Sequence, residues 1–188
     1  MSDQKDFIRA EALRHRQALQ VDPAWAEQAA DQFLSTLNVQ PGQVVSVYYP
    51  KGKELDTLPL VETLWAKKIF CALPVMQPDA QTLKFAMWNQ DTSLVEGSFG
   101  IPVPSDPHYV TPHIVVVPLL IFDQVGHRLG YGKGFYDVTL KHLRELRDIT
   151  AVGYAYAEQA CLFALPREDH DEKLDLVVTP QRVFDFRT

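Results

Sequence analysis

The sequence is poor in cysteine and contains no long apolar run. Only Cys71 and Cys161 occur among its 188 residues, each in an apolar stretch, so we expect two buried, reduced thiols rather than a disulfide or a redox pair. No segment approaches the length of a membrane span. The N-terminus mixes both charge signs and lacks the order of a secretion signal. These absences predict a cytoplasmic protein that does not interact with a membrane.

An excess of basic residues is also missing. Lys and Arg total 18 against 24 Asp and Glu, which gives a net charge of −6 and a pI of about 5.5. Because duplex binding generally needs a basic face, we expect no nucleic-acid partner. The histidines and cysteines show no zinc-ligand spacing. Any anionic ligand must therefore be held by a local cluster of cations.

Helix-like and strand-like segments alternate along the chain. Apolar spacing predicts helices at 5–19, 24–37, 57–67 and 135–147, and strands at 44–49, 69–75, 83–88, 113–122, 150–156 and 174–179. A glycine- and proline-rich loop is expected at 96–112, and a further helical piece at 158–165. The consecutive apolar positions of 113–122 indicate a strand covered on both faces. The pattern predicts a single α/β domain over 1–188, with a central, largely parallel sheet flanked by helices.

The stretch GHRLGYGKGFYD, residues 126–137, combines four glycines with Arg128 and Lys133. It is expected to follow the strand 113–122 directly and so to lie beyond the carboxyl end of a parallel strand, where open α/β sheets bind ligands. Glycine lets a ligand approach main-chain N–H groups, and the next helix adds its N-terminal N–H groups. These features together predict a polyphosphate site.

The glycine stretch matches neither of two familiar phosphate motifs. It is not G-x-G-x-x-G, and it is not a Walker A sequence, because Gly134 rather than Ser or Thr follows Lys133. A glycine-rich turn without a ligand stays the alternative. Asp137, in the first turn of the predicted helix, either stabilises the helix dipole or binds magnesium.

The stretch FDQVGHRLGYGKGFYD resembles the signature of the 5-formyltetrahydrofolate cyclo-ligase family. Lys5 and Arg9, the segment YYPKGKELDT (48–57) and the segment LPREDHDEKLDLVVT (165–179) also resemble that family. The resemblance implies a fold related to sugar isomerases and CoA-transferases. It also implies the ATP-dependent conversion of 5-formyltetrahydrofolate to 5,10-methenyltetrahydrofolate, with Mg²⁺ and release of ADP and phosphate.

The resemblance also implies a role for individual residues. The residues that would bind ATP are Lys5, Arg9, Arg128, Leu129, Gly130, Tyr131, Gly132, Lys133, Gly134, Phe135 and Tyr136, of which Arg128, Lys133 and Tyr136 would be catalytic. Those that would contact the folate are Tyr49, Glu54, Tyr131, Gly132, Lys133, Gly134 and Phe135. Magnesium would be held by Asp137 and Asp171. Val103 and Val138 depart from the family pattern, which has Glu and Arg there.

Other interpretations of these residues stay open. From spacing alone, Lys5 and Arg9 fit a solvated helix face, Glu54 a surface turn, Tyr49 a core aromatic position and Asp171 a charged loop. One rival function is a sugar-phosphate isomerase or a CoA-transferase-like enzyme. Another is a regulator that binds a nucleotide or a folate without catalysis. We expect a monomer.

Overall fold

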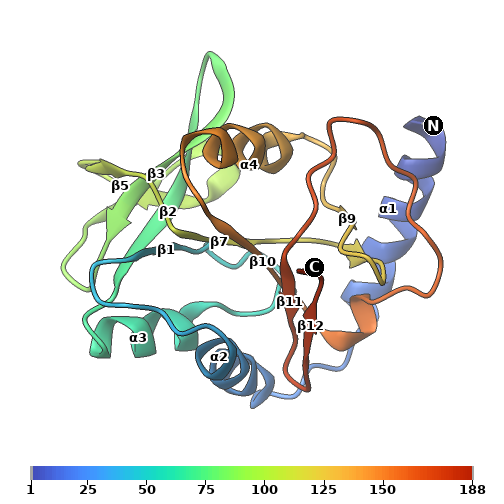
Figure 1. Ribbon diagram of the computed structural model, residues 1–188, viewed down its shortest axis with the longest axis horizontal. Coiled ribbons are helices and arrows are strands. Elements are labelled where there is room, and N and C mark those ends of the chain that lie inside the picture. The colour runs from blue at the N-terminus through green and yellow to red at the C-terminus, as the bar shows by residue number, and fades with distance from the viewer. Residues whose placement is uncertain (1, 188) are drawn as a thin grey trace.

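An eight-stranded sheet organises the computed structural model, which describes residues 2–187 (Figure 1). From one edge to the other the order is β12 (Val183–Asp185), β11 (Leu176–Val178), β10 (Thr150–Tyr154), β7 (Ile114–Val117), β1 (Val44–Ser46), β2 (Phe70–Gln77), β3 (Ala80–Trp88) and β6 (Tyr109–Val110). The five strands from β11 to β2 run parallel to one another, whereas β12 pairs antiparallel with β11, β3 with β2, and β6 with β3. This mixed, mostly parallel sheet confirms the predicted fold class.

Helices cover both faces of the sheet. Helices α2 (Trp25–Thr36) and α3 (Leu58–Ala66) pack on one face, and α4 (Phe135–Leu146) packs on the other (Figure 1). Strand β7 shows the consequence, because Ile114 and Val116 belong to the core under α2 and α3 while Val115 and Val117 belong to the core under α4. The prediction of a strand covered on both faces is confirmed.

The expected strand 113–122 is wrong in length. Pro118 has no N–H to give to a neighbouring strand, and β7 ends just before it. The chain then forms a hairpin of β8 (Ile121–Phe122) and β9 (Arg128–Leu129). The glycine stretch therefore begins within a hairpin and does not follow the central strand directly.

Three other parts of the chain differ from the expected elements. The loop expected at 96–112 is partly ordered: its first residue ends β4 (Leu94–Glu96), which pairs with β5 (Pro102–Pro104), and it also contains the 3₁₀ turn η1 (Ser98–Gly100) and edge strand β6. Prolines are tolerated there because edge strands leave some N–H positions unpaired. The helical piece expected at 158–165 is only the 3₁₀ turn η2 (Ala157–Gln159), and β12 was not expected at all.

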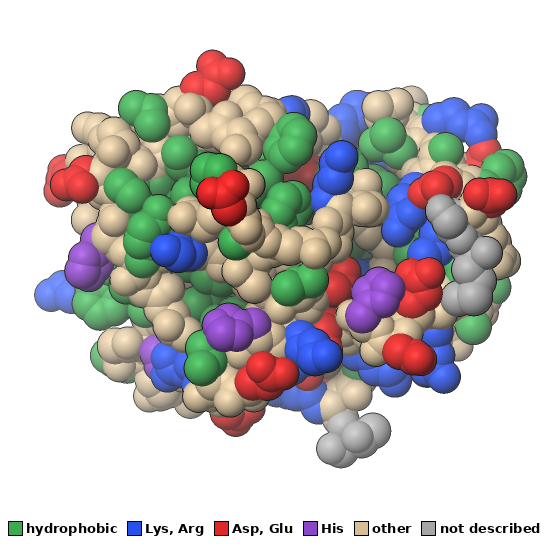
Figure 2. All heavy atoms as spheres, turned by 90° about the horizontal axis from the view of Figure 1, so that it is seen from above, with side chains coloured by type: hydrophobic (Ala, Val, Ile, Leu, Met, Phe, Trp, Pro, Cys, Tyr) green, Lys and Arg blue, Asp and Glu red, His purple; other side chains and the backbone are tan. Residues whose placement is uncertain are grey.

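Helix α1 (Ser2–Ala18) lies at one end of the sheet, beside the β8–β9 hairpin (Figure 1). Figure 2 shows acidic and basic side chains interspersed over the face that includes α4, and they are densest on the side of α1. Cys71 and Cys161 are buried and free, as predicted. Within residues 2–187, no helix has the length and apolar character needed to cross a membrane.

Candidate active site

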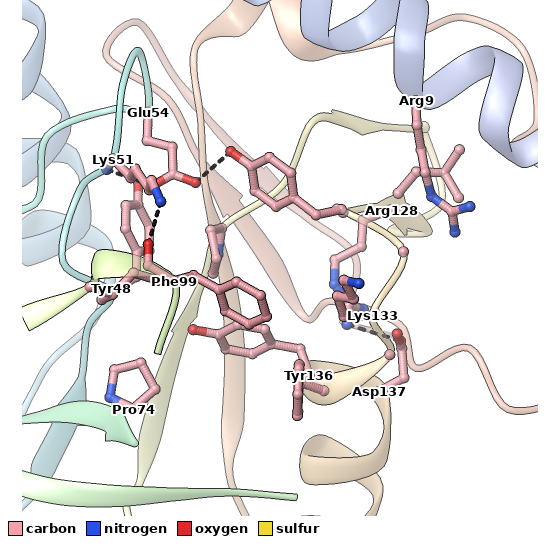
Figure 3. A pocket seen from close by; sticks show the side chains of 18 of the residues that line it. Arg9, Tyr48, Lys51, Glu54, Pro74, Phe99, Arg128, Lys133, Tyr136 and Asp137 are labelled. Carbon is pink, nitrogen blue, oxygen red and sulfur yellow. Dashed lines mark hydrogen bonds and ion pairs between the residues drawn. The ribbon is translucent and has the colours of Figure 1, made fainter. Parts of the chain in front are cut away.

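A cavity of about 600 Å³ opens where α1, the turn after β1, the η1 segment, the glycine stretch and the loop 168–171 meet (Figure 3). The structure brings all of the site residues predicted from the sequence to its lining: Lys5, Arg9, Tyr49, Glu54, every residue from Arg128 to Asp137, and Asp171. In Figure 3, Arg9 and Lys133 lie on one side of the cavity, and Lys51 and Glu54 lie on the other. Val103 also lines the cavity, whereas Val138 is not part of the lining.

The glycines within the cavity wall shape a loop that side chains would obstruct. Gly132 has a φ of +85°, and a Cβ added there would lie 3.2 Å from Cζ of Arg9. Gly134 has a φ of +71° and immediately precedes α4. Both values lie in the left-handed region that glycine adopts without steric cost. The loop can therefore present its main chain to a ligand directly beneath the Arg9 guanidinium.

Gly126 has a different role from the one predicted. It does not line the cavity, and it lies in the turn of the β8–β9 hairpin with a φ of +88°. A Cβ there would lie 2.8 Å from the carbonyl oxygen of Leu174 and 2.9 Å from the ring of Phe186. Gly126 is therefore required for close packing of the hairpin against the C-terminal segment, not for ligand approach.

Lys133 carries the most accessible positive charge of the loop. Its side chain is exposed, and its ammonium group forms no hydrogen bond or ion pair with the residues that the structure describes. Its carbonyl oxygen accepts a bond of 3.4 Å from Nε2 of Gln81. The first N–H groups of α4, which lack acceptors within the helix, follow directly. A free cation and a helix N-terminus thus border the same loop.

Lys5 is instead enclosed by acidic groups. Its side chain is only 4% exposed, and its Nζ lies 2.8 Å from Glu168 and 2.7 Å from Asp171. Burial opposes the charged form of Lys5, but the bonds to the two carboxylates outweigh burial and raise its pKa. The bond to Lys5 lowers the pKa of Glu168. Asp171, whose burial acts in the opposite direction, also has a lowered pKa because Lys5 and the Glu168 N–H donate to it.

Arg128 joins the glycine stretch to the C-terminal loop. Its guanidinium donates to the carbonyl oxygen of Glu172 and, at 2.9 Å, to Oδ1 of Asp137. The same Asp137 oxygen accepts a bond of 3.1 Å from the backbone N–H of Glu172. Arg128 therefore fixes Asp137 and the start of α4 against the loop that carries Asp171.

Aromatic and acidic groups form the opposite wall. Glu54 accepts a bond of 2.8 Å from the Tyr131 hydroxyl and one of 2.9 Å from the backbone N–H of Lys51. Tyr49 packs against Trp88, with ring centroids 6.1 Å apart. Burial raises the pKa of Tyr136 well above its usual range, so its phenol is neutral and can donate a hydrogen bond.

The acidic groups near the loop suit a magnesium ion. Glu168, His170 and Asp171 place ligand atoms within 4.8 Å of one another, and Asp137 lies on the adjacent segment. Only Oδ1 of Asp137 is engaged by Arg128 and Glu172. Carboxylate oxygens are the protein ligands that Mg²⁺ prefers. The donor chemistry therefore fits the ion that the sequence predicted.

Sequence reasoning missed several residues of the lining. Arg16 lies on α1 seven residues after Arg9, and this helical spacing could have placed it on the same face. Glu168 lies in a charged loop, and no pattern in the sequence marks it as a site residue. Phe99, with a φ of +58°, belongs to the segment expected to be irregular, and its carbonyl oxygen accepts a bond of 2.5 Å from Nζ of Lys51.

Known proteins resemble the chain along nearly its whole length. The sequence profile of the 5-formyltetrahydrofolate cyclo-ligase family matches residues 1–180. The 5-formyltetrahydrofolate cyclo-ligase of Escherichia coli K12 is 36% identical over 168 residues, covering 85% of this chain and 90% of that protein. The enzyme of the same name from Mycolicibacterium smegmatis is 31% identical, with coverages of 95% and 94%.

Solved structures agree with the sequence relatives. The NMR structure of 5,10-methenyltetrahydrofolate synthetase from Aquifex aeolicus superposes with a TM-score of 0.80 at 28% identity, covering 98% of this chain and 93% of that one. The synthetase from Mycoplasma pneumoniae, at 21% identity, shares the fold with a TM-score of 0.74 and coverages of 94% and 98%. Together with the family profile and the two sequence relatives, these matches establish that the chain belongs to the 5-formyltetrahydrofolate cyclo-ligase family.

Proposed function

We propose that the chain uses ATP to convert 5-formyltetrahydrofolate to 5,10-methenyltetrahydrofolate. The formyl oxygen attacks the γ-phosphorus of ATP, which breaks the bond to the β-phosphate oxygen and releases ADP. The neighbouring folate nitrogen then attacks the activated formyl carbon, closes the ring and loses its proton to water. The C–O bond breaks, and inorganic phosphate leaves with the former formyl oxygen.

One observation carries this proposal. Residues far apart in the sequence, which the family resemblance assigns to ATP, folate and metal, all line a single cavity. An amide oxygen is a weak nucleophile, so catalysis depends on aligning it with the γ-phosphate and on neutralising the charge that moves onto the phosphates. A cavity with Arg9 and Lys133 on one side and Glu54 on the other can meet both demands.

The cationic side is proposed to hold the triphosphate. Lys133 is the free cation of the loop. Arg9 lies over Gly132; its Nη1 pairs with Asp6 at 2.6 Å, whereas its Nε is buried and without a partner among residues 2–187. The loop N–H groups and the N-terminus of α4 add donors that are fixed in place before ATP arrives. We assign to Lys133 the charge that develops on the transferred phosphoryl group. Lys5 and Arg128, which are already engaged by acidic groups, hold the surrounding segments and complete the phosphate site.

The opposite side is proposed to hold the folate. A pterin ring is flat and rich in N–H donors, which suits the Glu54 carboxylate beside the aromatic rings of Tyr49 and Tyr136. The neutral phenol of Tyr136 can donate to an oxygen of the substrate but cannot serve as a base near neutral pH. This wall would orient the formyl group toward the loop.

Asp137 and Asp171 are the proposed magnesium ligands, and Glu168 is a further carboxylate close to Asp171. When bound, Mg²⁺ would neutralise phosphate charge and fix the geometry of the triphosphate. Arg128 holds Asp137 in place through the bond to Oδ1 and leaves Oδ2 available to the ion.

The remaining expectations stay predictions. They are a cytoplasmic monomer with no nucleic-acid or membrane partner, and a kinship of fold with sugar isomerases and CoA-transferases. A sugar-phosphate isomerase would not need Lys5 and Arg9 at the loop, and a pure binder would not need both Lys133 and Asp137. Their common place in the cavity lining favours the cyclo-ligase.

The purified protein, mixed with 5-formyltetrahydrofolate, ATP and Mg²⁺, should develop the ultraviolet absorbance of the methenyl product. No absorbance should develop without ATP, and ADP should form in equal amount. A folded protein that gives no signal with all components present would refute the proposed function.

A further inference from the structure

Arg16 is a buried cation without an acidic partner. Its side chain is 3% exposed, and its two terminal nitrogens donate to the carbonyl oxygen of Leu119 at 3.3 Å and to the Tyr131 hydroxyl at 2.5 Å. Its Nε is buried and bonds to nothing within residues 2–187, and no carboxylate of that range forms an ion pair with it. Buried charges are normally compensated, so the position of Arg16 requires an explanation.

The charge of Arg16 is compensated indirectly, through the phenol of Tyr131. A guanidinium has only donors, so the Tyr131 oxygen accepts from Arg16 and its hydrogen must point elsewhere. That hydrogen lies toward Oε1 of Glu54, at an oxygen-to-oxygen distance of 2.8 Å. The Arg16 guanidinium also lies 5.5 Å from the centroid of the Tyr131 ring. Arg16, Tyr131 and Glu54 thus form a directed chain of hydrogen bonds, which we call the Arg16 relay.

The Arg16 relay connects the two sides of the cavity. Tyr131 lies between Gly130 and Gly132 in the proposed phosphate loop, whereas Glu54 belongs to the proposed folate wall. The other Glu54 oxygen is fixed by the Lys51 N–H at 2.9 Å. Because its neighbours on both sides are glycines, the backbone of Tyr131 has little stiffness of its own. Its side-chain bonds to Arg16 and Glu54 are therefore what define its place in the cavity.

Building on the proposed function, we propose that Arg16 is a positioning residue that couples nucleotide binding to folate binding through Tyr131. A nucleotide orders the glycine loop and so fixes Tyr131 and, through it, Glu54. The folate then binds a carboxylate that is already oriented and loses less conformational entropy on binding. By linkage, the folate tightens nucleotide binding by the same factor.

The coupling can be measured by titrating 5-formyltetrahydrofolate calorimetrically, with and without a saturating non-hydrolysable ATP analogue and Mg²⁺. The wild-type protein should bind the folate about 5- to 20-fold more tightly with the analogue, within the usual range of such couplings. The substitutions Arg16→Met and Tyr131→Phe should each reduce this ratio to less than about 2-fold. The double variant should lose no more than either single variant, because both interrupt one chain. Arg16→Lys, which keeps the charge, should retain part of the coupling.

Arg14→Met is the matched control, because Arg14 lies on the same helix, is 70% exposed and does not line the cavity. It should keep the wild-type ratio. If Arg16→Met does not fold, Tyr131→Phe, at a side chain that is 50% exposed, decides the question alone. An unchanged ratio in Tyr131→Phe, additive losses in the double variant, or no coupling in the wild type would overturn the inference.

Failure of the inference is distinguishable from failure of the proposed function. If the wild-type protein forms the methenyl product and Tyr131→Phe keeps the wild-type coupling, only the Arg16 relay is rejected. Cooperative binding that depends on Arg16, with no product formed, would reject the catalytic proposal and support the relay.

Discussion

At the scale of single residues, the cations that line the cavity differ in whether they already bind acidic groups of the protein. Lys5 is held by two carboxylates and Arg128 by Asp137 and the Glu172 carbonyl oxygen. The Lys133 ammonium contacts none of the described acidic groups in this way. A cation without a protein partner can give its full interaction to a transferred phosphoryl group, so Lys133 should contribute most to catalysis.

Lys133→Ala should lower kcat by about 100- to 1,000-fold, by analogy with the removal of one preorganised donor. Steady-state measurement of methenyl formation tests this, and Lys133→Arg should restore part of the rate. Lys141→Ala removes the same charge from an exposed position of α4 outside the cavity lining and should leave the rate unchanged. Wild-type turnover in Lys133→Ala would refute the role.

The residue scale also shows where a sequence pattern misleads. All four glycines of the stretch 126–137 suggested ligand approach, but only those after residue 129 border the cavity. Gly126 is needed because the C-terminal segment, which includes Leu174 and Phe186, packs against it. Contacts between segments so distant in sequence cannot be read from local spacing.

At the scale of elements, α1 closes one end of the cavity, and its Lys5 joins it to the loop near the C-terminus. Lys5 reaches from α1 to Glu168 and Asp171, which lie more than 160 residues later in the chain. The two carboxylates have lowered pKa values in the folded protein. Their contribution to stability is therefore present at neutral pH and is lost as the pH falls through the folded pKa values.

Lys5→Met should lower the melting temperature at pH 7, because two neighbouring carboxylates lose their cation. The shift is roughly 2–4 °C for each kcal/mol lost in a protein of this size. Between pH 5 and pH 3 the wild type should lose stability more steeply than the variant, in which those carboxylates no longer gain from ionisation. Calorimetry across this pH range measures both slopes. Parallel slopes would contradict the predicted linkage.

Elements were predictable where the pattern is local. The helices α1 to α4 and the central strands follow from apolar spacing. The pairs β4–β5 and β8–β9 were missed because their strands are only two or three residues long, and because prolines lie within β5 and glycines directly follow β4 and β9. Such short strands are formed by tertiary contacts rather than by their own propensity.

At the scale of the whole molecule, the sheet brings distant segments to one cavity. The parallel strands place the turn after β1 near the residues that follow β7, and helices cover the sheet on both faces. The family resemblance, and not the spacing of residues, identified Lys5, Arg9, Tyr49, Glu54 and Asp171 as site residues. Helical and strand periodicity reports burial, whereas the convergence of these residues depends on the topology of the sheet.

The central claim is that this cavity directs the γ-phosphate of ATP to the formyl oxygen of the folate. The most direct test uses 5-formyltetrahydrofolate that carries ¹⁸O in the formyl group and follows the label by mass spectrometry of the released phosphate. The account predicts one ¹⁸O atom in each phosphate formed with the methenyl product. Product accompanied by unlabelled phosphate would contradict it.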